Sequence, residues 1–420
     1  MTNKEVNIEN NNHSYLHSLE IDGINCFKDK QTLDLSDGNG NYSPWTIILG
    51  DNGTGKTTLL KALDSMQPVT DARGIGESVT YPSRFFHFFN KYKQSEIKLF
   101  INLNNEIISF SSPTIELNGV NFKSHLGSIN NFLLSYGASR RMNRKENFVK
   151  ENFTMTSLFD ESIELINAEE WFLQKEMISL KADQKTKKKF QREFQSVKNI
   201  LIDILPDVND IRVKPINETN LKLLLEVQTS FGWVNLRDLS FGYQTLTALI
   251  VDIASKMMEQ YQNSDNPLEE PVIILIDEID LHLHPKWQRI VIDKLSENFP
   301  KAQFIATSHS PLIVQAAQDK GANIVVCRKE GDKVIIDNNP DEVKGWRIDQ
   351  ILTSDLFEAD SSRSIATQEN IDNYISLKGK KDLSPKEKNE FDKLIPKVKT
   401  AFSESVLDEK LLQFTEKYLK

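Results

Sequence analysis

One short stretch of the sequence has residue types and spacing suited to holding phosphate groups. Residues 50–57 read GDNGTGKT, a G-x-x-x-x-G-K-T pattern between an apolar run and a helical pattern. Glycines at these positions let backbone N–H groups turn toward a phosphate, and the start of the following helix adds positive partial charge. Lys56 would reach the β- and γ-phosphates, and the Thr57 hydroxyl would bind Mg²⁺. The predicted ATP-binding residues here are Asn52, Gly53, Thr54, Gly55, Lys56, Thr57 and Thr58.

Two adjacent carboxylates follow a second apolar run. Residues 272–278 read VIILIDE, which predicts a buried strand with Asp277 and Glu278 at its carboxyl end. Asp277 would hold Mg²⁺ together with Thr57, and Glu278 would be the catalytic group that orients and deprotonates water. An isolated Asp-Glu pair is more often a solvated turn. After such a strand, and in a chain with a phosphate loop, the pair is better interpreted as a metal-binding and catalytic pair.

A third segment, residues 239–244, reads LSFGYQ and is followed at once by the helical pattern TLTALIVDIASKM. Ser240 would cap this helix, and Ser240 and the backbone near Gly242 could donate hydrogen bonds to a γ-phosphate. The hexapeptide alone is a weak signal. Its position between the phosphate loop and the acidic strand makes it a predicted ATP contact, with Gln244 included.

The patterns between these segments predict an α/β fold with a parallel sheet core, because buried apolar runs alternate with helical patterns. Residues 80–136 read as an antiparallel meander containing IKLFINL, EIISFS and FLLSYG. Helical spacing over about 157–205 predicts a lobe, and a further helix is expected over 287–297. The strands DIRVKP and LKLLLEV are assigned to the returning core.

Four motifs, in their order along the chain, resemble those of the ABC ATPases of the RecF, SMC and OLD branch. They are residues 50–57, 239–244, 273–278 and 307–311, the last reading TSHSP. The resemblance implies an ABC-type P-loop NTPase head with a mixed sheet core, an antiparallel subsheet, an inserted helical lobe and a C-terminal helical tail. It implies that two copies sandwich ATP between one phosphate loop and the other copy's LSFGYQ signature. It also makes His309 a second catalytic residue that contacts the γ-phosphate and the attacking water, although a lone histidine is more often structural.

The resemblance and the composition shifts divide the chain into five predicted parts. These are a disordered lead-in (1–14), the N-terminal half of the ATPase head (15–155), the helical lobe (156–206), the C-terminal half of the head (207–340) and a helical partner or oligomerisation region (341–420).

Within that branch, several segments look like the PtuA-type anti-phage ATPases of Septu systems and some retrons. They are YGASRR at 136–141, FDES, NAEEW, EIDLHLHP and GWRIDQILTSDLF. The resemblance implies a homodimer or a higher even-numbered homo-oligomer that regulates or scaffolds an HNH-type nuclease, with DNA reached through the complex. We identify no nuclease motif in the chain itself, because KEGDKV at 329–334 is better explained as a hairpin than as an acidic nuclease motif.

Two other functions stay open. One is a RecF-like DNA-repair ATPase that binds DNA directly, and the other is a scaffold that binds ATP but hydrolyses it slowly. Strong DNA affinity with a steep salt dependence would favour repair. Equal, negligible turnover by the protein and by Glu278→Gln would favour the scaffold.

The chain departs from the ABC pattern where other members carry a glutamine after the strand FLLSYG. The YGASRR segment could take its place, and its Arg140 and Arg141 are candidates for contact with nucleic acid or a partner. Lys187, Lys188 and Lys189 are further candidates within a basic run, although such runs are usually solvated helix faces. His282 and His284 form an H-x-H pair, which the family's LHLHP segment accounts for without a metal.

The composition of the chain excludes several classes of protein. The 420 residues carry a formal net charge of −9 and only two cysteines, Cys26 and Cys327, so neither a disulfide framework nor a nucleic-acid coat is indicated. No apolar run approaches the ~20 residues of a membrane span, and the N-terminus does not read as a secretory signal. We therefore expect a cytoplasmic protein with no membrane contact.

Overall fold

The computed structural model describes eleven stretches of the chain in two compact units. The stretches are 14–65, 96–103, 106–111, 132–143, 156–214, 224–340, 343–354, 356–357, 361, 363–380 and 383–402. The first unit spans Met1–Trp346 and the second spans Arg347–Lys420. The predicted lead-in (1–14) lies almost entirely outside the described residues, as does the predicted start of the tail at 341.

The first unit is organised around a six-stranded sheet with the order β13-β12-β3-β11-β10-β6. Its strands are β3 (Trp45–Gly50), β6 (Leu133–Tyr136), β10 (Val272–Ile276), β11 (Ala302–Thr307), β12 (Asn323–Glu330) and β13 (Lys333–Asp337). Five of them run parallel, and β13 pairs antiparallel with β12 at one edge. Every residue of β10 and β11 is buried, which is why the sequence of β10 is apolar without alternation.

Two details of this sheet bear on the sequence predictions. The FLLSYG segment forms β6, which pairs in parallel with β10, so its assignment to the antiparallel meander is wrong. Its four buried residues carry no alternation that would reveal the partner strand. The KEGDKV segment forms the β12–β13 hairpin, in which Glu330 pairs with Lys333, and the hairpin prediction is confirmed.

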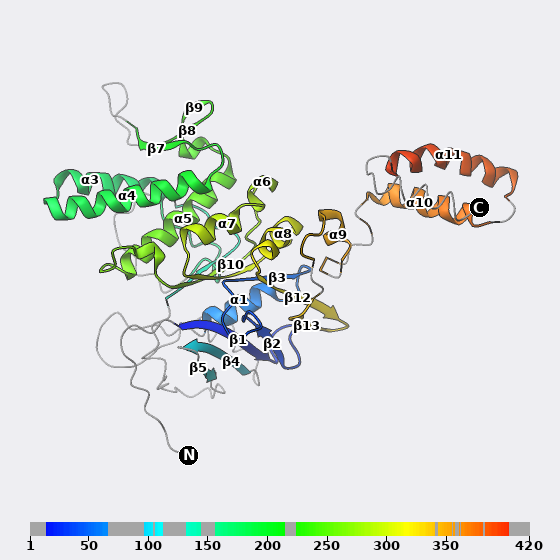
Figure 1. Ribbon diagram of the computed structural model, residues 1–420, viewed down its shortest axis with the longest axis horizontal. Helices are drawn as coiled ribbons and strands as arrows, with labels where there is room; N and C mark the ends of the chain where they lie inside the picture. The colour runs from blue at the N-terminus through cyan, green and yellow to red at the C-terminus, as the bar shows by residue number, and fades with distance from the viewer. Residues whose placement is uncertain are drawn as a thin grey trace, which may run out of the picture. The chain divides into compact units, whose positions relative to one another are not determined.

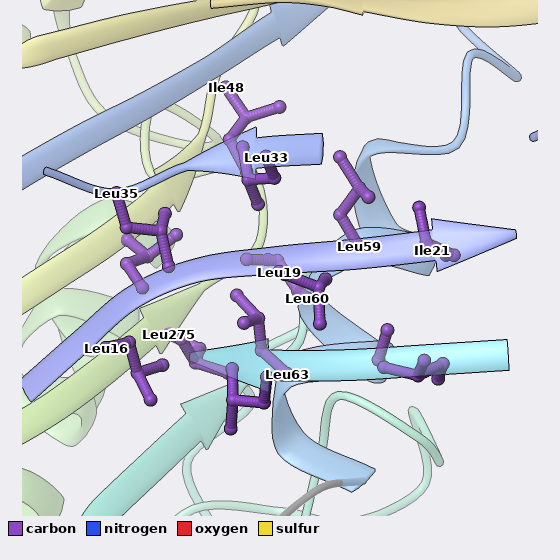
Figure 2. Close-up of a cluster of buried hydrophobic side chains, with 14 of the residues drawn as sticks. Leu16, Leu19, Ile21, Leu33, Leu35, Ile48, Leu59, Leu60, Leu63 and Leu275 are labelled. Atoms are coloured by element: carbon purple, nitrogen blue, oxygen red, sulfur yellow. The ribbon is translucent and has the colours of Figure 1, made fainter. Parts of the chain in front are cut away.

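A four-stranded antiparallel sheet covers one side of the core sheet, with helix α1 (Lys56–Ser65) between the two. The strands are β1 (Ser14–Asp22), β2 (Gln31–Asp34), β4 (Glu96–Leu103) and β5 (Glu106–Ser111), in the order β2-β1-β4-β5. Figure 2 shows apolar side chains of β1 and β2 meeting those of α1 and of the core strands β3 and β10 in one buried cluster, to which β4 also contributes. The cluster fixes α1, and so the loop preceding it, to both sheets. The predicted antiparallel subsheet is thereby confirmed for IKLFINL and EIISFS.

Helices cover the other side of the core sheet (Figure 1). They are α5 (Phe241–Gln260), α6 (Pro285–Gln288), α7 (Val291–Asn298) and α8 (Pro311–Asp319). The single helix expected over 287–297 is in fact two, since α6 ends at a cap on Arg289 and α7 begins after Ile290.

The helical lobe is an antiparallel pair, α3 (Ala168–Lys181) and α4 (Gln184–Ile204), that packs on α5 (Figure 1). Helix α3 begins eleven residues later than the helical spacing from 157 suggested, because Asn167 caps it by accepting from the Glu170 backbone N–H. Asp183 caps α4 in the same way. Polar side chains therefore set both helix starts, and the described residues 156–166 form turns and one β-bridge, from Leu165 to Met142.

Three strands beside the lobe form a sheet of their own. They are β7 (Asp210–Val213), β8 (Leu225–Thr229) and β9 (Gly232–Asn235), paired antiparallel in sequence order. The assignment of DIRVKP and LKLLLEV to the parallel core is therefore wrong. Alternating patterns identify strands but do not say which sheet they join.

The second unit contains α9 (Ile348–Leu352), α10 (Ile365–Lys378) and α11 (Pro385–Phe402). Ser384 and Glu387 exchange hydrogen bonds at the start of α11 in a capping box. Tyr374 of α10 stacks on Phe391 of α11 with ring centroids 5.0 Å apart. Among the described residues of both units, no helix is long and apolar enough to cross a membrane.

Candidate active site

The parallel sheet brings four separate segments of the chain to one edge. Strands β3, β11, β10 and β6 are neighbours, and each is followed at its carboxyl end by a segment that the sequence singled out. Ligands of open α/β sheets bind at this edge. Here the structure has a pocket of about 530 Å³. Its lining residues are Asn25, Cys26, Asn52, Gly53, Gly55, Lys56, Thr57, Thr58, Asp277, Glu278 and His309.

The phosphate loop has the backbone that its glycines predict. Gly53 and Gly55 have φ angles of +81° and +85°, in the left-handed region that favours glycine. A Cβ on Gly55 would lie 2.5 Å from the Cys26 Sγ, so this glycine is also required by close packing. The buried Thr54 closes the turn, because its hydroxyl donates to the Asp51 carbonyl oxygen at 2.8 Å. Thr54 thus supports the loop from within and does not line the pocket.

The Lys56 side chain lies under this loop. Its Nζ donates to the carbonyl oxygens of Gly50 and Asp51 at 2.8 and 2.9 Å. Burial lowers the pKa of Lys56, while Cys327 and the nearby carboxyl groups, chief among them Asp277, act in the opposite direction. A phosphate in the pocket could take over hydrogen bonds that the loop carbonyls now receive.

The oxygen groups expected at Mg²⁺ lie within hydrogen-bond distance of each other. Thr57 Oγ1 donates to Asp277 Oδ2 at 2.8 Å, and Thr307 Oγ1 donates to Asp277 Oδ1 at 2.6 Å. A hydroxyl and one carboxylate, completed by substrate phosphate and water, form the oxygen-rich set that Mg²⁺ prefers. This donor set therefore fits Mg²⁺. The described residues contain no group of three or more His, Cys, Asp or Glu side chains that could hold a metal by themselves.

The backbone at Glu278 is unusual. Its φ is +50°, which is strained for a residue with a Cβ and occurs most often at functional sites. The Glu278 N–H donates to Thr307 Oγ1 at 2.7 Å, and the Glu278 carbonyl oxygen accepts from Arg140 Nη2 at 2.9 Å. With its peptide groups held on both sides, the residue extends its side chain into the pocket.

Arg140 requires a correction. The sequence placed it with Arg141 as a contact for nucleic acid or a partner, but only 4% of its surface is exposed. Its guanidinium donates to main-chain carbonyl oxygens in the interior, so it is not available on the surface. Arg141 is exposed.

The histidines have different environments. His309 is exposed, lines the pocket and donates its backbone N–H to Asp280 Oδ1 at 3.3 Å. His284 caps α6, because its Nδ1 accepts from the Lys286 N–H at 3.3 Å. The His282 ring packs edge-on against Phe241 with centroids 4.7 Å apart. The H-x-H pair is thus divided between a helix cap and an aromatic contact.

The signature segment lies outside this pocket. Ser240 is exposed at the N-cap of α5, and its side chain makes no capping hydrogen bond. A Cβ on Gly242 would lie 2.4 Å from the His282 carbonyl oxygen, so the helix start packs closely on the segment after β10. The Gln244 side-chain amide donates to the carbonyl oxygens of Arg237 and Leu239 and so braces its own loop.

Lys187, Lys188 and Lys189 are exposed in the first turns of α4, remote in sequence from all pocket-lining residues. No ion pair is recorded for them within the part of the chain that the structure describes. The structure therefore does not bring the basic run and the pocket residues together.

Two pocket-lining residues were missed by the sequence reasoning. Asn25 and Cys26 form a two-residue turn between Ile24 and Phe27, whose N–H and C=O groups pair at 3.0 and 2.9 Å. Asn25 has a φ of +51° and its Nδ2 donates to Thr58 Oγ1 at 3.3 Å. An asparagine between two apolar residues is a turn signal, but only the folded chain shows that the turn touches the phosphate loop. Phe27 is fully buried against Gly55 and belongs to the core.

Two protein-family models match the sequence. A family model described as "AAA domain, putative AbiEii toxin, Type IV TA system" matches residues 46–315, and a second, described as "AAA domain", matches residues 18–66. The first covers the phosphate loop, the signature segment, the acidic strand and His309.

Among curated proteins, the chain is similar to a Septu protein PtuA of Bacillus mycoides, with 28% identity over 354 residues, or 82% of this chain and 45% of that protein. It is 44% identical over 92 residues to the retron Vc95 probable ATPase of Vibrio cholerae, which is 22% of this chain and 18% of that protein. A Septu protein PtuA of Bacillus thuringiensis is 24% identical over 381 residues, 83% of this chain and 85% of that protein. The chain spans less than half the length of the first two.

Among solved structures, the SMC head domain from Thermotoga maritima aligns with a TM-score of 0.40 and 14% identity, covering 78% of this chain and 99% of that one. The architecture described above, a phosphate loop on a mixed sheet with an antiparallel subsheet, is that of an ABC-type P-loop ATPase. Because the matching family model covers well over half of the sequence, the chain belongs to the AAA-domain family whose model is described as "AAA domain, putative AbiEii toxin, Type IV TA system".

Proposed function

We propose that this protein binds ATP with Mg²⁺ and hydrolyses it to ADP and phosphate. The observation that carries the proposal is the hydrogen bond between Thr57 and Asp277, which joins the phosphate loop to the acidic strand in a pocket that Lys56, Glu278 and His309 also line. Phosphate-binding groups, oxygen ligands for a divalent cation and a carboxylate base are thus within one pocket.

Each side chain has a distinct task in the proposed reaction. Lys56 and the backbone N–H groups of its loop hold the phosphates, and Thr57 and Asp277 would hold Mg²⁺, which supplies positive charge to the phosphate oxygens. Glu278 orients a water molecule and accepts its proton as the water attacks the γ-phosphate. His309 contacts the γ-phosphate and this water.

We further propose that the signature segment completes the site of a second copy. Support comes from the exposed Ser240 hydroxyl, which makes no capping bond at the start of α5, and from the absence of Ser240, Gly242 and Gln244 among the described residues that line the pocket. A helix start of this kind donates well to a phosphate brought from outside. The assembly would be a homodimer or a higher even-numbered homo-oligomer.

The biological role that we propose is anti-phage defence together with an HNH-type nuclease. It is supported by similarity to proteins named as Septu PtuA and retron ATPases and by the PtuA-like segments of the sequence. DNA would be reached through the complex, with Arg141 and Lys187, Lys188 and Lys189 as exposed basic contacts for nucleic acid or the partner.

ATP binding and turnover test the first proposal. Wild-type protein should bind ATP and release phosphate, whereas Lys56→Ala should lose binding because it lacks the only lysine that lines the pocket among the described residues. Unchanged ATP affinity in Lys56→Ala would refute the assignment of the site. Negligible turnover in both wild type and Glu278→Gln, with ATP still bound, would favour the slow scaffold.

The partner proposal is tested by co-expression of the chain with its neighbouring genes, purification with and without ATP, and an assay of DNA cleavage. A co-purifying nuclease that responds to ATP is the expected result. A variant with Glu at positions 187, 188 and 189 should weaken the contact, whereas Lys301→Glu with Lys320→Glu and Lys329→Glu, at exposed positions of the head, serves as a control of equal charge change. A homodimer that binds DNA tightly by itself would instead support the repair ATPase.

A further inference from the structure

Arg140 makes an unusual set of contacts. It follows β6 with a φ of +28°, and its side chain extends beneath the end of β10. Nη1 donates to the carbonyl oxygens of Asp277 and, at 3.3 Å, Gly137, and Nη2 donates to that of Glu278 at 2.9 Å. One guanidinium thus binds the two consecutive peptide carbonyls that carry the metal-binding and water-activating acids. The guanidinium does this with two separate nitrogens in a fixed plane, whereas an ammonium has all its donors on one nitrogen.

The contact lies at a strained point of the backbone. Glu278 has a φ of +50° and lines the pocket in that conformation. Thr307 holds the amide side of the residue by accepting from its N–H at 2.7 Å, and Arg140 holds the carbonyl side. Such strained conformations persist only where the surroundings fix them. The two contacts together act as a clamp on Glu278, defined here as the Arg140–Thr307 clamp.

The loop that carries Arg140 is itself fixed by the segment leading into the helical lobe. Gly137 N–H donates to Ser157 Oγ at 3.1 Å, and Leu165 N–H donates to the Arg141 carbonyl oxygen at 2.7 Å. A Cβ on Gly137 would lie 2.2 Å from the Ser157 carbonyl oxygen, so the two segments are in close contact. Leu165 lies three residues before the start of α3. Arg140 is therefore held at two places. Its loop is fixed to the segment that leads into the lobe, and its guanidinium is bound to the end of β10.

Charge adds to the contact. Burial lowers the pKa of Arg140 to about 10, although Asp277, Asp280 and Glu278 favour the charged form. The side chain is still protonated at neutral pH. A buried cation without carboxylates nearby would be costly, so its position next to three of them is accounted for by attraction as well as by hydrogen bonding.

We propose that Arg140 is a positioning residue for ATP hydrolysis, which holds the Glu278 peptide in its left-handed conformation so that the carboxylate meets the attacking water. The proposal rests on the proposed ATPase function. It assigns to Arg140 no contact with ATP. It also makes the lobe connection at Ser157 and Leu165 a route by which a partner bound to α3 and α4 could alter turnover.

Steady-state kinetics with three variants test the proposal. Arg140→Lys keeps the charge but replaces the separate Nη1 and Nη2 donors by a single nitrogen on a shorter side chain, and Arg140→Ala removes the whole contact. We expect kcat to fall about 100-fold in Arg140→Ala, as for other misplaced catalytic groups, and less in Arg140→Lys, while KM and the Kd for ATP change little. Arg289→Ala, at an exposed arginine outside the pocket lining, is the matched control and should behave as wild type. Circular dichroism and the thermal midpoint show which variants are folded at the assay temperature.

A residue that served the fold alone would give a different pattern. The thermal midpoint would then fall in Arg140→Lys and Arg140→Ala while kcat, measured where both are folded, stayed at the wild-type value, and that result would overturn the proposal. Equal losses of kcat and ATP affinity would also overturn the proposal, since they would show that Arg140 contributes to ATP binding.

A second readout does not depend on hydrolysis. Backbone amide exchange of peptides covering 272–284 should be faster in Arg140→Lys than in wild type and unchanged in Arg289→Ala. If wild type proves to have no turnover, the proposed ATPase function fails, and the exchange data still decide on the clamp. Unchanged exchange in Arg140→Lys would show that Arg140 does not hold Glu278.

Discussion

The two segments expected to contact the γ-phosphate differ sharply in how they are held. On the phosphate-loop side, Lys56, Thr57 and Asp277 are joined by hydrogen bonds to loop carbonyls and to one another. On the signature side, Ser240 is exposed without a capping bond and Phe241 is 41% exposed. One side is an interlocked pocket and the other is an open surface.

The difference indicates what each side needs in order to work. The pocket is assembled by the sheet, since its residues follow neighbouring strands and their hydrogen bonds are already made within one copy. The signature segment is braced from behind by Gln244 but directs its hydroxyl outward. A polar helix start with unused donors is explained if its ligand arrives on another molecule. The predictions below test this contrast in order of expected effect.

The largest effect is expected where the pocket performs chemistry. Glu278→Gln removes the base but keeps the size and the backbone contacts of the residue, so turnover should fall about 1000-fold while ATP affinity is retained. The ATP-bound pair of copies should then accumulate, and size-exclusion chromatography with light scattering would show it. Glu269→Gln, on an exposed short helix, is the control. Wild-type turnover in Glu278→Gln would show that Glu278 is not the catalytic base.

A second prediction separates the two sides from each other. Ser240→Arg places a large cation at the signature side and should abolish turnover, while ATP still binds to the intact pocket of the same copy. Lys56→Ala should also abolish turnover, because it loses ATP binding in its own pocket while its signature segment stays intact. A mixture of the two should regain about a quarter of wild-type turnover, because random pairing forms mixed dimers in which one composite site is intact.

The mixture is measured by phosphate release, with each variant alone as the control. No recovery, under conditions where mixed dimers are shown to form, would indicate that each copy completes its own site and would contradict the sandwich. Recovery without dimers would contradict it as well.

The same contrast explains what the sequence could reveal. The phosphate loop, the acidic pair and the signature are recognisable because each is local, with glycine spacing or an apolar run that can be identified within ten residues. Their convergence follows from parallel strands, which have a shared carboxyl edge. Asn25, Cys26 and the buried position of Arg140 could not be predicted, since they depend on contacts between segments 29 or more residues apart.

The sequence also did not show which sheet each predicted strand joins. A buried run such as FLLSYG can join either sheet, and only pairing with β10 places Arg140 under the acidic strand end. The same ambiguity led to the wrong sheet for β7 and β8. Alternation and burial identify the face of a strand but leave its neighbour undetermined.

The smallest predicted effect concerns the framework behind the pocket. Asp64 lies near the end of α1, and burial raises the pKa of its carboxyl from 3.8 to about 6, while Ser135 offsets part of the rise. Since the folded-state pKa is the higher one, the carboxyl contributes stability that is fully present below about pH 4 and is lost as the pH rises through 6. Asp64→Asn should therefore stabilise the protein by about 3 kcal/mol at pH 7.5 and by about half as much at pH 5.

Thermal unfolding of both proteins at the two pH values measures this difference. Other titrating groups shift both proteins alike, so the pH dependence of the difference between them isolates Asp64. Asp319→Asn, on α8, is a suitable control because its carboxyl is exposed. A constant difference between pH 5 and 7.5 would mean that the end of α1 is hydrated in solution. The phosphate-loop side would then be less tightly packed than its hydrogen bonds indicate. It would differ from the signature side only in its local hydrogen bonds.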